Sequence, residues 1–207
     1  MKYPAVLLAT IALPFLCAGQ THGKASGKRP ALVVRVFNQA GLDRQTLRDA
    51  ERDAARIFLG AGIQSTVESS SGDFPLRQPR SGELLVRIVD WKPLAATQGM
   101  LGYVGVDRAS SVRFAAAYQP AVDKIAKAFA CEPYQVLGAV IVHEIGHLIL
   151  GPAHGRHGLM HPNWGPLQFL LIKCRDLEFT SEEAGRLRED VDSMLSAAAD
   201  SSEPPSH

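Results

Sequence analysis

The chain of 207 residues has no marked excess of charge, since 22 lysine and arginine residues stand against 21 acidic ones and give a formal net charge of +1. Proteins that bind nucleic acid or acidic lipid carry a basic surface, so the sequence predicts neither partner. Internal repeats and signs of a second folded domain are also lacking. With 46% hydrophobic and 21% charged residues, the composition fits one globular domain with a sizeable core.

Cysteine is scarce, and one of the three cysteines lies within the first 19 residues. Residues 1–19 have the pattern of a signal peptide: Lys2 supplies the positive charge, Ala5–Leu16 the apolar core, and residues 17–19 a small-residue cleavage region. The apolar run is short and broken by proline, which disfavours a stable membrane anchor. Lipidation of the cysteine is an alternative that the bulky Leu16 disfavours. We therefore expect a secreted or periplasmic protein.

The other two cysteines, Cys131 and Cys174, lie on either side of the histidine-rich motif described below. Export implies an oxidising compartment, so the sequence predicts a disulfide between Cys131 and Cys174. Two unrelated buried thiols are the alternative.

The hydrophobic pattern divides the rest of the chain into one domain over residues 31–196, between a polar lead-in at residues 20–30 and a disordered tail at residues 197–207. Apolar runs predict strands at residues 31–37, 63–67, 84–89 and 113–118. Helices are predicted after Asp43, from Pro120, over residues 134–150, and after the capping box Thr180-Ser181-Glu182-Glu183. The segment that contains Trp164, Phe169 and Leu170 is expected to be irregular.

The helix predicted at residues 134–150 contains the motif H-E-x-x-H, formed by His143, Glu144 and His147. Residues four apart lie on one face of a helix, so both imidazoles can bind one ion. Zinc accepts such ligands, and a catalytic zinc site uses three protein ligands and a water. Glu144 lies beside the imidazoles, which suits a base that takes a proton from the zinc-bound water. The alternative is that both histidines are ordinary core residues whose hydrogen bonds are made within the protein.

A third ligand has to return to the same ion after the helix ends. Gly151 and Pro152 are predicted to end it, because glycine adopts positive φ and proline cannot continue a helix. His154 is the first imidazole after this stop and is predicted as the third ligand, with His157 and His161 as alternatives. A glutamate ligand is a further alternative, and the candidates are Glu178, Glu182 and Glu183.

This stretch resembles the metzincin zinc peptidases, whose signature is HExxHxxGxxH followed by a Met-turn. His143, Glu144 and His147 match this signature directly. Gly151 and His154 match with one extra residue, because the spacing here is HExxHxxxGxxH. It also resembles uncharacterised secreted zincin-like bacterial proteins that keep a lengthened spacing, over about residues 84–191. The resemblance implies one Zn²⁺, a peptidase activity, and Met160 as the Met-turn methionine. Met160 could instead be an ordinary core methionine.

The resemblance also implies the fold: an α+β zincin-like domain with a mixed twisted sheet, an antiparallel edge strand, a zinc-binding helix, and a small C-terminal subdomain with the Met-turn and a final helix. The glycine-rich residues 97–106 would form the edge strand over the site, where an extended peptide could pair; a glycine-rich loop is the alternative.

The predicted function is a secreted, monomeric zinc endopeptidase that acts on a peptide or protein substrate through Glu144. A zinc-binding module without useful catalysis is the alternative. Few residues separate the signal peptide from the first strand, so no inhibitory propeptide is expected.

Overall fold

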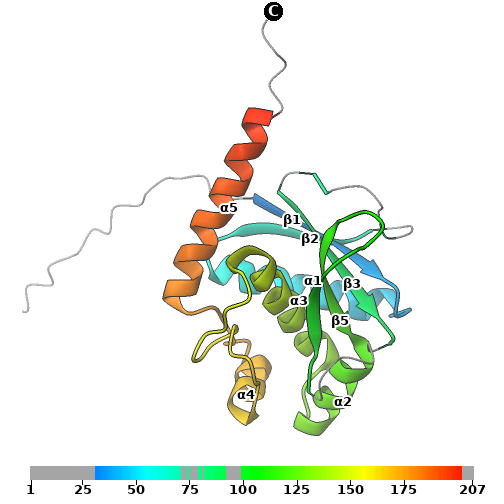
Figure 1. Ribbon diagram of the computed structural model, residues 1–207. Helices are drawn as coiled ribbons and strands as arrows, with labels where there is room; N and C mark the ends of the chain where they lie inside the picture. Colours follow the sequence, from blue (N-terminus) through cyan, green and yellow to red (C-terminus); the bar gives the residue numbers. More distant parts are fainter. Residues whose placement is uncertain (1–30, 71–73, 75–78, 81, 92–98, 202–207) are drawn as a thin grey trace, which may run out of the picture.

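The computed structural model describes residues 31–70, 74, 79–80, 82–91 and 99–201 (Figure 1). The predicted signal peptide and lead-in, and the last six residues of the predicted tail, lie outside the described residues.

Five strands form one mixed sheet in the order β2-β1-β3-β5-β4. The strands are β1 (Ala31–Asn38), β2 (Gln64–Ser69), β3 (Glu83–Val89), β4 (Gly102–Val106) and β5 (Arg113–Tyr118). β1, β2, β3 and β5 pair in parallel, whereas β4 pairs antiparallel with β5 at one edge. The prediction of a mixed sheet with an antiparallel edge strand is therefore confirmed.

The described residues form five helices: α1 (Arg44–Gly60), α2 (Gln119–Phe129), α3 (Pro133–Leu150), α4 (Pro166–Cys174) and α5 (Ser181–Ser201). The predicted caps are present. The Asp43 carboxylate accepts from the first amides of α1, and Thr180 and Glu183 bond each other's backbone amides at the start of α5.

The sequence prediction missed α4 and shortened α5. An irregular segment was expected where α4 lies, but Pro166 opens this helix and the Gln168 side chain accepts from the amide of Gly165 at 2.9 Å. α5 continues to Ser201, so residues 197–201 of the predicted disordered tail are helical.

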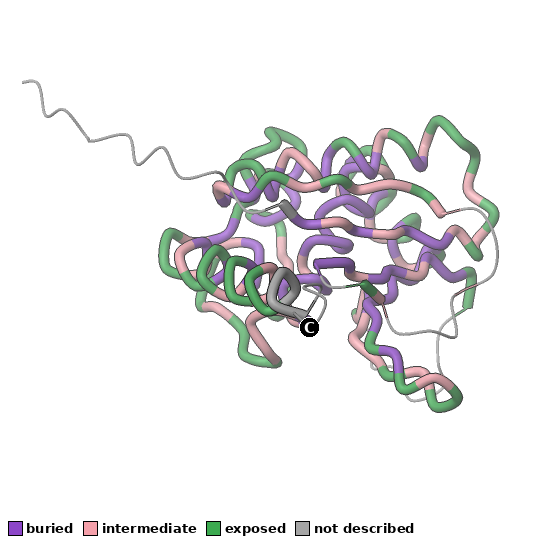
Figure 2. The backbone as a smooth tube through the Cα atoms, turned by 90° about the horizontal axis from the view of Figure 1, so that it is seen from above, coloured by how far each residue is buried: buried purple, intermediate pink, exposed green. Residues whose placement is uncertain are grey.

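The main core lies between one face of the sheet and the helices, with α1 and α3 packed against each other (Figures 1 and 2). Gly138 allows the close approach of these helices, because a Cβ there would lie only 2.9 Å from the Ala50 carbonyl oxygen. Alternate residues of the strands face the other side, where Phe37 and Phe114 pack around Phe74.

α3 is mostly apolar and buried, because it is the central helix of this core. By length and composition it could cross a membrane, with 18 residues and a mean hydropathy of 1.2, but 67% of it is buried inside the fold. Burial in a protein core accounts for such a composition.

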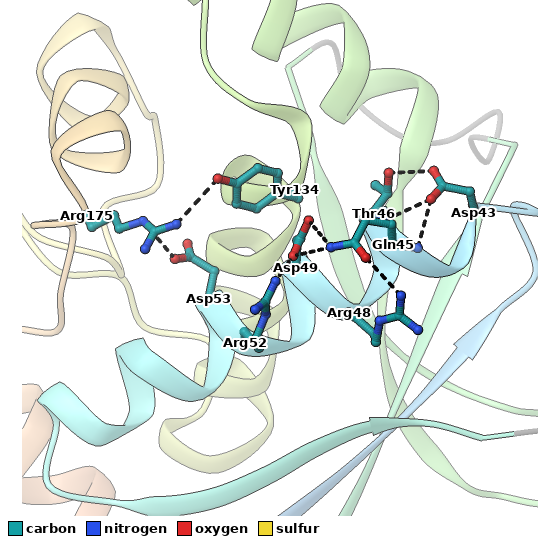
Figure 3. A network of polar contacts seen from close by, with 9 residues as sticks. All are labelled: Asp43, Gln45, Thr46, Arg48, Asp49, Arg52, Asp53, Tyr134 and Arg175. Carbon is teal, nitrogen blue, oxygen red and sulfur yellow. Dashed lines mark hydrogen bonds and ion pairs between the residues drawn. The ribbon is translucent and has the colours of Figure 1, made fainter.

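A polar network connects the start of α3 with α1 and with the end of α4 (Figure 3). The buried Asp53 carboxylate pairs with Arg56 at 3.2 Å and with Arg175 at 3.8 Å. Arg175 also donates to the Tyr134 hydroxyl at 3.4 Å. The segment that follows the histidine motif is thereby tied back to the body of the domain.

The predicted disulfide is absent, because both Cys131 and Cys174 are free thiols. The Cys131 thiol is buried and lies 3.5 Å from the Phe169 carbonyl oxygen, whereas Cys174 is exposed at the last residue of α4, five residues further along the helix. A disulfide needs the two Cβ atoms close together and suitably directed, and an oxidising compartment does not by itself provide this geometry.

Candidate active site

α3 carries two histidines on one face, as the i, i+4 spacing predicted. The Nε2 atoms of His143 and His147 lie 3.1 Å apart, and the Nε2 atom of His154 lies 3.1 Å from that of His147. The three ligand atoms all lie within 4.8 Å of one another. Among the described residues, this is the only cluster of three or more histidine, cysteine or acidic side chains able to hold a metal ion.

Backbone carbonyl groups orient both helical imidazoles. The Nδ1 atom of His143 lies 2.8 Å from the Leu159 carbonyl oxygen, and that of His147 lies 3.0 Å from the Gly151 carbonyl oxygen. A carbonyl oxygen can only accept, so each Nδ1 carries the proton. In their neutral forms both rings therefore present an unprotonated Nε2 to the centre of the cluster.

Two bare nitrogens that face each other repel unless a cation lies between them. Two nitrogens bound tetrahedrally to zinc at about 2.0–2.1 Å are separated by about 3.3 Å, close to the 3.1 Å observed for two of the pairs. Tethering of the outer nitrogen to a carbonyl is typical of metal-ligating histidines. Burial also lowers the pKa of His143 to about 4, which keeps this ring neutral and able to ligate. The donor set therefore fits a zinc ion.

Of the candidates for the third ligand, the structure brings His154 to the pair. α3 ends at Leu150, and Gly151 adopts a φ of +87°, which starts the loop that returns His154. The amide of Gly155 donates to the Met160 carbonyl oxygen at 2.9 Å and closes this loop. The pKa of His154 is lowered by burial and by the neighbouring His147 and His161.

The alternative ligands lie outside the cluster. His157 is exposed on the loop, and His161 lines the cavity beside the cluster. Glu183 belongs to the α5 capping box, and the Glu178 carboxylate lies against Gly60 in α1.

Glu144 follows His143 on α3 but faces the edge strand. Its side chain is 7% exposed, and burial raises the pKa of its carboxyl to about 8. A Cβ on Gly102 of β4 would lie 2.7 Å from Glu144 Cγ and 2.8 Å from its Oε1 atom. The absence of a side chain at Gly102 therefore makes room for the carboxyl group.

Met160 packs against α3 at the level of the imidazoles. It is 1% exposed, and its sulfur lies 2.6 Å from the position that a Cβ on Gly146 would occupy. The missing side chain at Gly146, next to His147, allows this approach.

The cluster lies in a cavity of about 690 Å³. It is lined by residues 99–101 and the start of β4, and by the segment 161–164 with Phe169 of α4. Val140 and Ile125 add an apolar surface. A cavity of this size is typical of sites for small molecules or side chains, which are mostly apolar with a few polar groups.

No protein-family model matches the sequence, and no curated protein sequence matches it. Among solved structures, the fold is similar to a zinc-dependent peptidase from Methanocorpusculum labreanum (strain Z), with 14% sequence identity and a TM-score of 0.47 over 74% of this chain and 99% of that one. It is also similar to metalloproteinase-II from Bacteroides fragilis, with 11% identity and a TM-score of 0.43 over 78% of this chain and 53% of that one. A function has to be inferred from the residues of the site themselves.

The sequence did not reveal the groups that orient the imidazoles. The carbonyls of Gly151 and Leu159 have no side-chain signal, because every residue has a carbonyl group. The sequence places Trp164 only in a segment expected to be irregular, although its Nε1 atom donates to the Leu159 carbonyl oxygen at 3.1 Å.

Proposed function

We propose that the protein is a zinc-dependent peptidase. The observation that carries this proposal is the convergence of three imidazole nitrogens, two of them from rings tethered to carbonyl groups, beside a buried carboxyl group in one cavity. A purely structural zinc site has four protein ligands and needs no base. Here three histidines and an adjacent glutamate match the requirements of catalysis.

His143, His147 and His154 would hold the zinc ion. When bound, zinc supplies Lewis-acid chemistry, which polarises a carbonyl group and makes water more acidic. Glu144 would accept a proton from the attacking water and pass it to the leaving amine. Its raised pKa applies to the protein without a cation; a positive charge at the imidazoles favours the ionised carboxylate, the form that can act as a base.

An extended peptide beside β4 is the substrate that fits this arrangement. β4 is the outermost strand of the described sheet at the end nearest α3, and its first residues line the cavity. A peptide that paired with its free edge would pass over the cluster, with the backbone approaching closely at Gly102. Met160, beneath the histidines, would be the counterpart of the metzincin Met-turn methionine.

Zinc content and hydrolysis, measured on the same preparations, test the proposal. Purified protein should contain about one zinc per chain and hydrolyse members of a peptide library. Glu144→Gln should retain zinc and lose about 10²–10⁴-fold in rate. Glu189→Gln, an exposed carboxylate on α5, should match the wild type.

Equal turnover by the wild type and Glu144→Gln would contradict the proposed base. If both proteins retained zinc and neither hydrolysed peptides, the result would favour the alternative of a zinc-binding module without useful catalysis.

We also propose that the protein is exported and monomeric. Support for export comes from the sequence of residues 1–19. Expression of the full chain in a bacterial host, followed by fractionation and mass analysis of the mature N-terminus, tests this. An uncleaved chain in the cytoplasm would contradict export. Light scattering of the purified product tests the oligomeric state, and a stable dimer would contradict a monomer.

A further inference from the structure

The Leu159 carbonyl oxygen is shared between a predicted zinc ligand and a tryptophan. It accepts from His143 Nδ1 at 2.8 Å and from Trp164 Nε1 at 3.1 Å. A carbonyl oxygen has two lone pairs and an indole N–H only donates, so both bonds form at once. The amide of Leu159 in turn donates to the Glu178 carbonyl oxygen at 2.8 Å. Leu159, whose carbonyl orients His143, is therefore hydrogen-bonded through both its carbonyl oxygen and its amide.

The Trp164 ring also packs directly on the imidazole. The Trp164 and His143 rings meet edge to face, with centroids 5.5 Å apart and planes at 88°. The Trp164 ring also contacts the Phe169 ring of α4, with centroids 6.3 Å apart. The Phe169 ring in turn stacks on the Phe129 ring of α2, with centroids 4.2 Å apart. The indole thus packs on Phe169 of α4, which is itself supported by α2, and it meets the His143 ring edge to face.

From these contacts we infer that Trp164 is a positioning residue for the metal centre. Its N–H fixes the Leu159 carbonyl, and its ring limits rotation of the His143 imidazole, so the His143 Nε2 atom is held toward the other two ligands. The inference rests on the proposed zinc site. It assigns to Trp164 a role beyond filling space, because the hydrogen bond and the ring contact both act on the same ligand.

Trp164→Phe separates the two roles, since phenylalanine keeps an aromatic ring but cannot donate to Leu159. The control is Trp91→Phe: Trp91 is 49% exposed and does not line the cavity. Zinc affinity is measured by chelator competition well below the unfolding temperature. Loss of a group that supports a metal ligand typically costs 10–100-fold in affinity, so we expect about tenfold weaker binding for Trp164→Phe and wild-type binding for Trp91→Phe. The visible spectrum of the Co²⁺-loaded protein should change only in Trp164→Phe.

A purely packing role predicts a different result. Trp164→Phe would then unfold at a lower temperature but bind zinc with wild-type affinity and show an unchanged cobalt spectrum, which would overturn the inference. A wild-type protein that bound no zinc would overturn the proposed function and this inference with it. A wild-type protein that bound zinc, together with a Trp164→Phe variant of equal affinity, would overturn this inference alone.

A second measurement leaves Trp164 intact. The chain has two tryptophans, so protein labelled with ¹⁵N-tryptophan gives two indole N–H signals, which Trp91→Phe assigns. Zinc should shift the Trp164 signal and leave the Trp91 signal in place, and the hydrogen-bonded Trp164 N–H should exchange slowly with solvent. A Trp164 signal that does not respond to zinc would overturn the inference even if Trp164→Phe failed to fold.

Discussion

Gly102 is the residue of β4 whose substitution should damage catalysis most selectively. A Cβ at this position would lie 2.4 Å from the Ala116 carbonyl oxygen, 2.7 Å from Glu144 Cγ and 2.8 Å from Glu144 Oε1. Real Cβ atoms essentially never come closer than 3.0 Å to such neighbours. Gly102→Ala therefore forces a movement of about 0.6 Å or more against the backbone of β5, together with displacement of the Glu144 side chain.

The size of the effect follows from these contacts. Overpacking a dense site costs about 1–3 kcal/mol, and the loss of glycine flexibility in the unfolded chain offsets about 0.4–1 kcal/mol of that. A net cost of about 1–2 kcal/mol lowers the melting temperature by roughly 2–8 °C for a domain of this size. Misplacing a catalytic group by about 1 Å costs up to about 10²-fold in rate, so we expect kcat/KM to fall about 10- to 100-fold.

Gly105→Ala is the matched control. It lies on the same strand, but its Cβ would meet the rings of Tyr103 and Phe114 on the opposite face of the sheet. Both variants should lose stability and retain zinc, whereas only Gly102→Ala should lose hydrolysis of a peptide substrate. Wild-type kcat/KM in Gly102→Ala, or an equal loss of activity in both variants, would contradict a direct effect of β4 on the proposed catalytic carboxyl group of Glu144.

Three further changes test other parts of the structure. His154→Ala should weaken zinc binding sharply in chelator competition and His157→Ala should not; the reverse order would show that the lengthened spacing changes the ligand. Met160→Ala should lower the free energy of unfolding by about 2–5 kcal/mol in urea denaturation, because the side chain is 1% exposed, and a loss under 1 kcal/mol would contradict its tight packing. Burial raises the pKa of Glu51 above its ordinary 4.5, so its neutral form is favoured in the fold; the resulting stability is present below pH 4.5 and is lost as the pH rises through the raised pKa. The amide side chain introduced by Glu51→Gln can still accept from Ser69. The free energy of unfolding of this variant, relative to that of the wild type, should therefore be higher at pH 7 than at pH 4. An equal difference at both pH values would contradict this.

Patterns with a short physical range could be predicted from the sequence. The i, i+4 spacing of His143 and His147 determines that both rings project from one face of a helix, and the glycine at residue 151 ends that helix. The buried strands of the parallel sheet follow from apolar runs. Each of these features depends on neighbouring residues alone, so the chain order contains the necessary information.

Features that depend on distant segments could not be predicted in the same way. The free state of Cys131 depends on where α4 packs, and α4 itself depends on the Gln168 side chain reaching back to the Gly165 amide. The fit of Glu144 against β4 depends on Gly102, about forty residues earlier in the chain. Such contacts are decided by tertiary packing, which gives no periodic signal.

The three residues between His147 and Gly151 have a structural consequence that the spacing alone does not show. With three residues between them, Gly151 lies four positions after His147, one helical turn further along, and its carbonyl comes within 3.0 Å of His147 Nδ1. The residue that ends α3 therefore also orients one of the proposed ligands. Because Gly151 adopts positive φ at the same point, the chain can turn there and bring back His154, so the helix stop, the orientation of His147 and the return of His154 all depend on one backbone position.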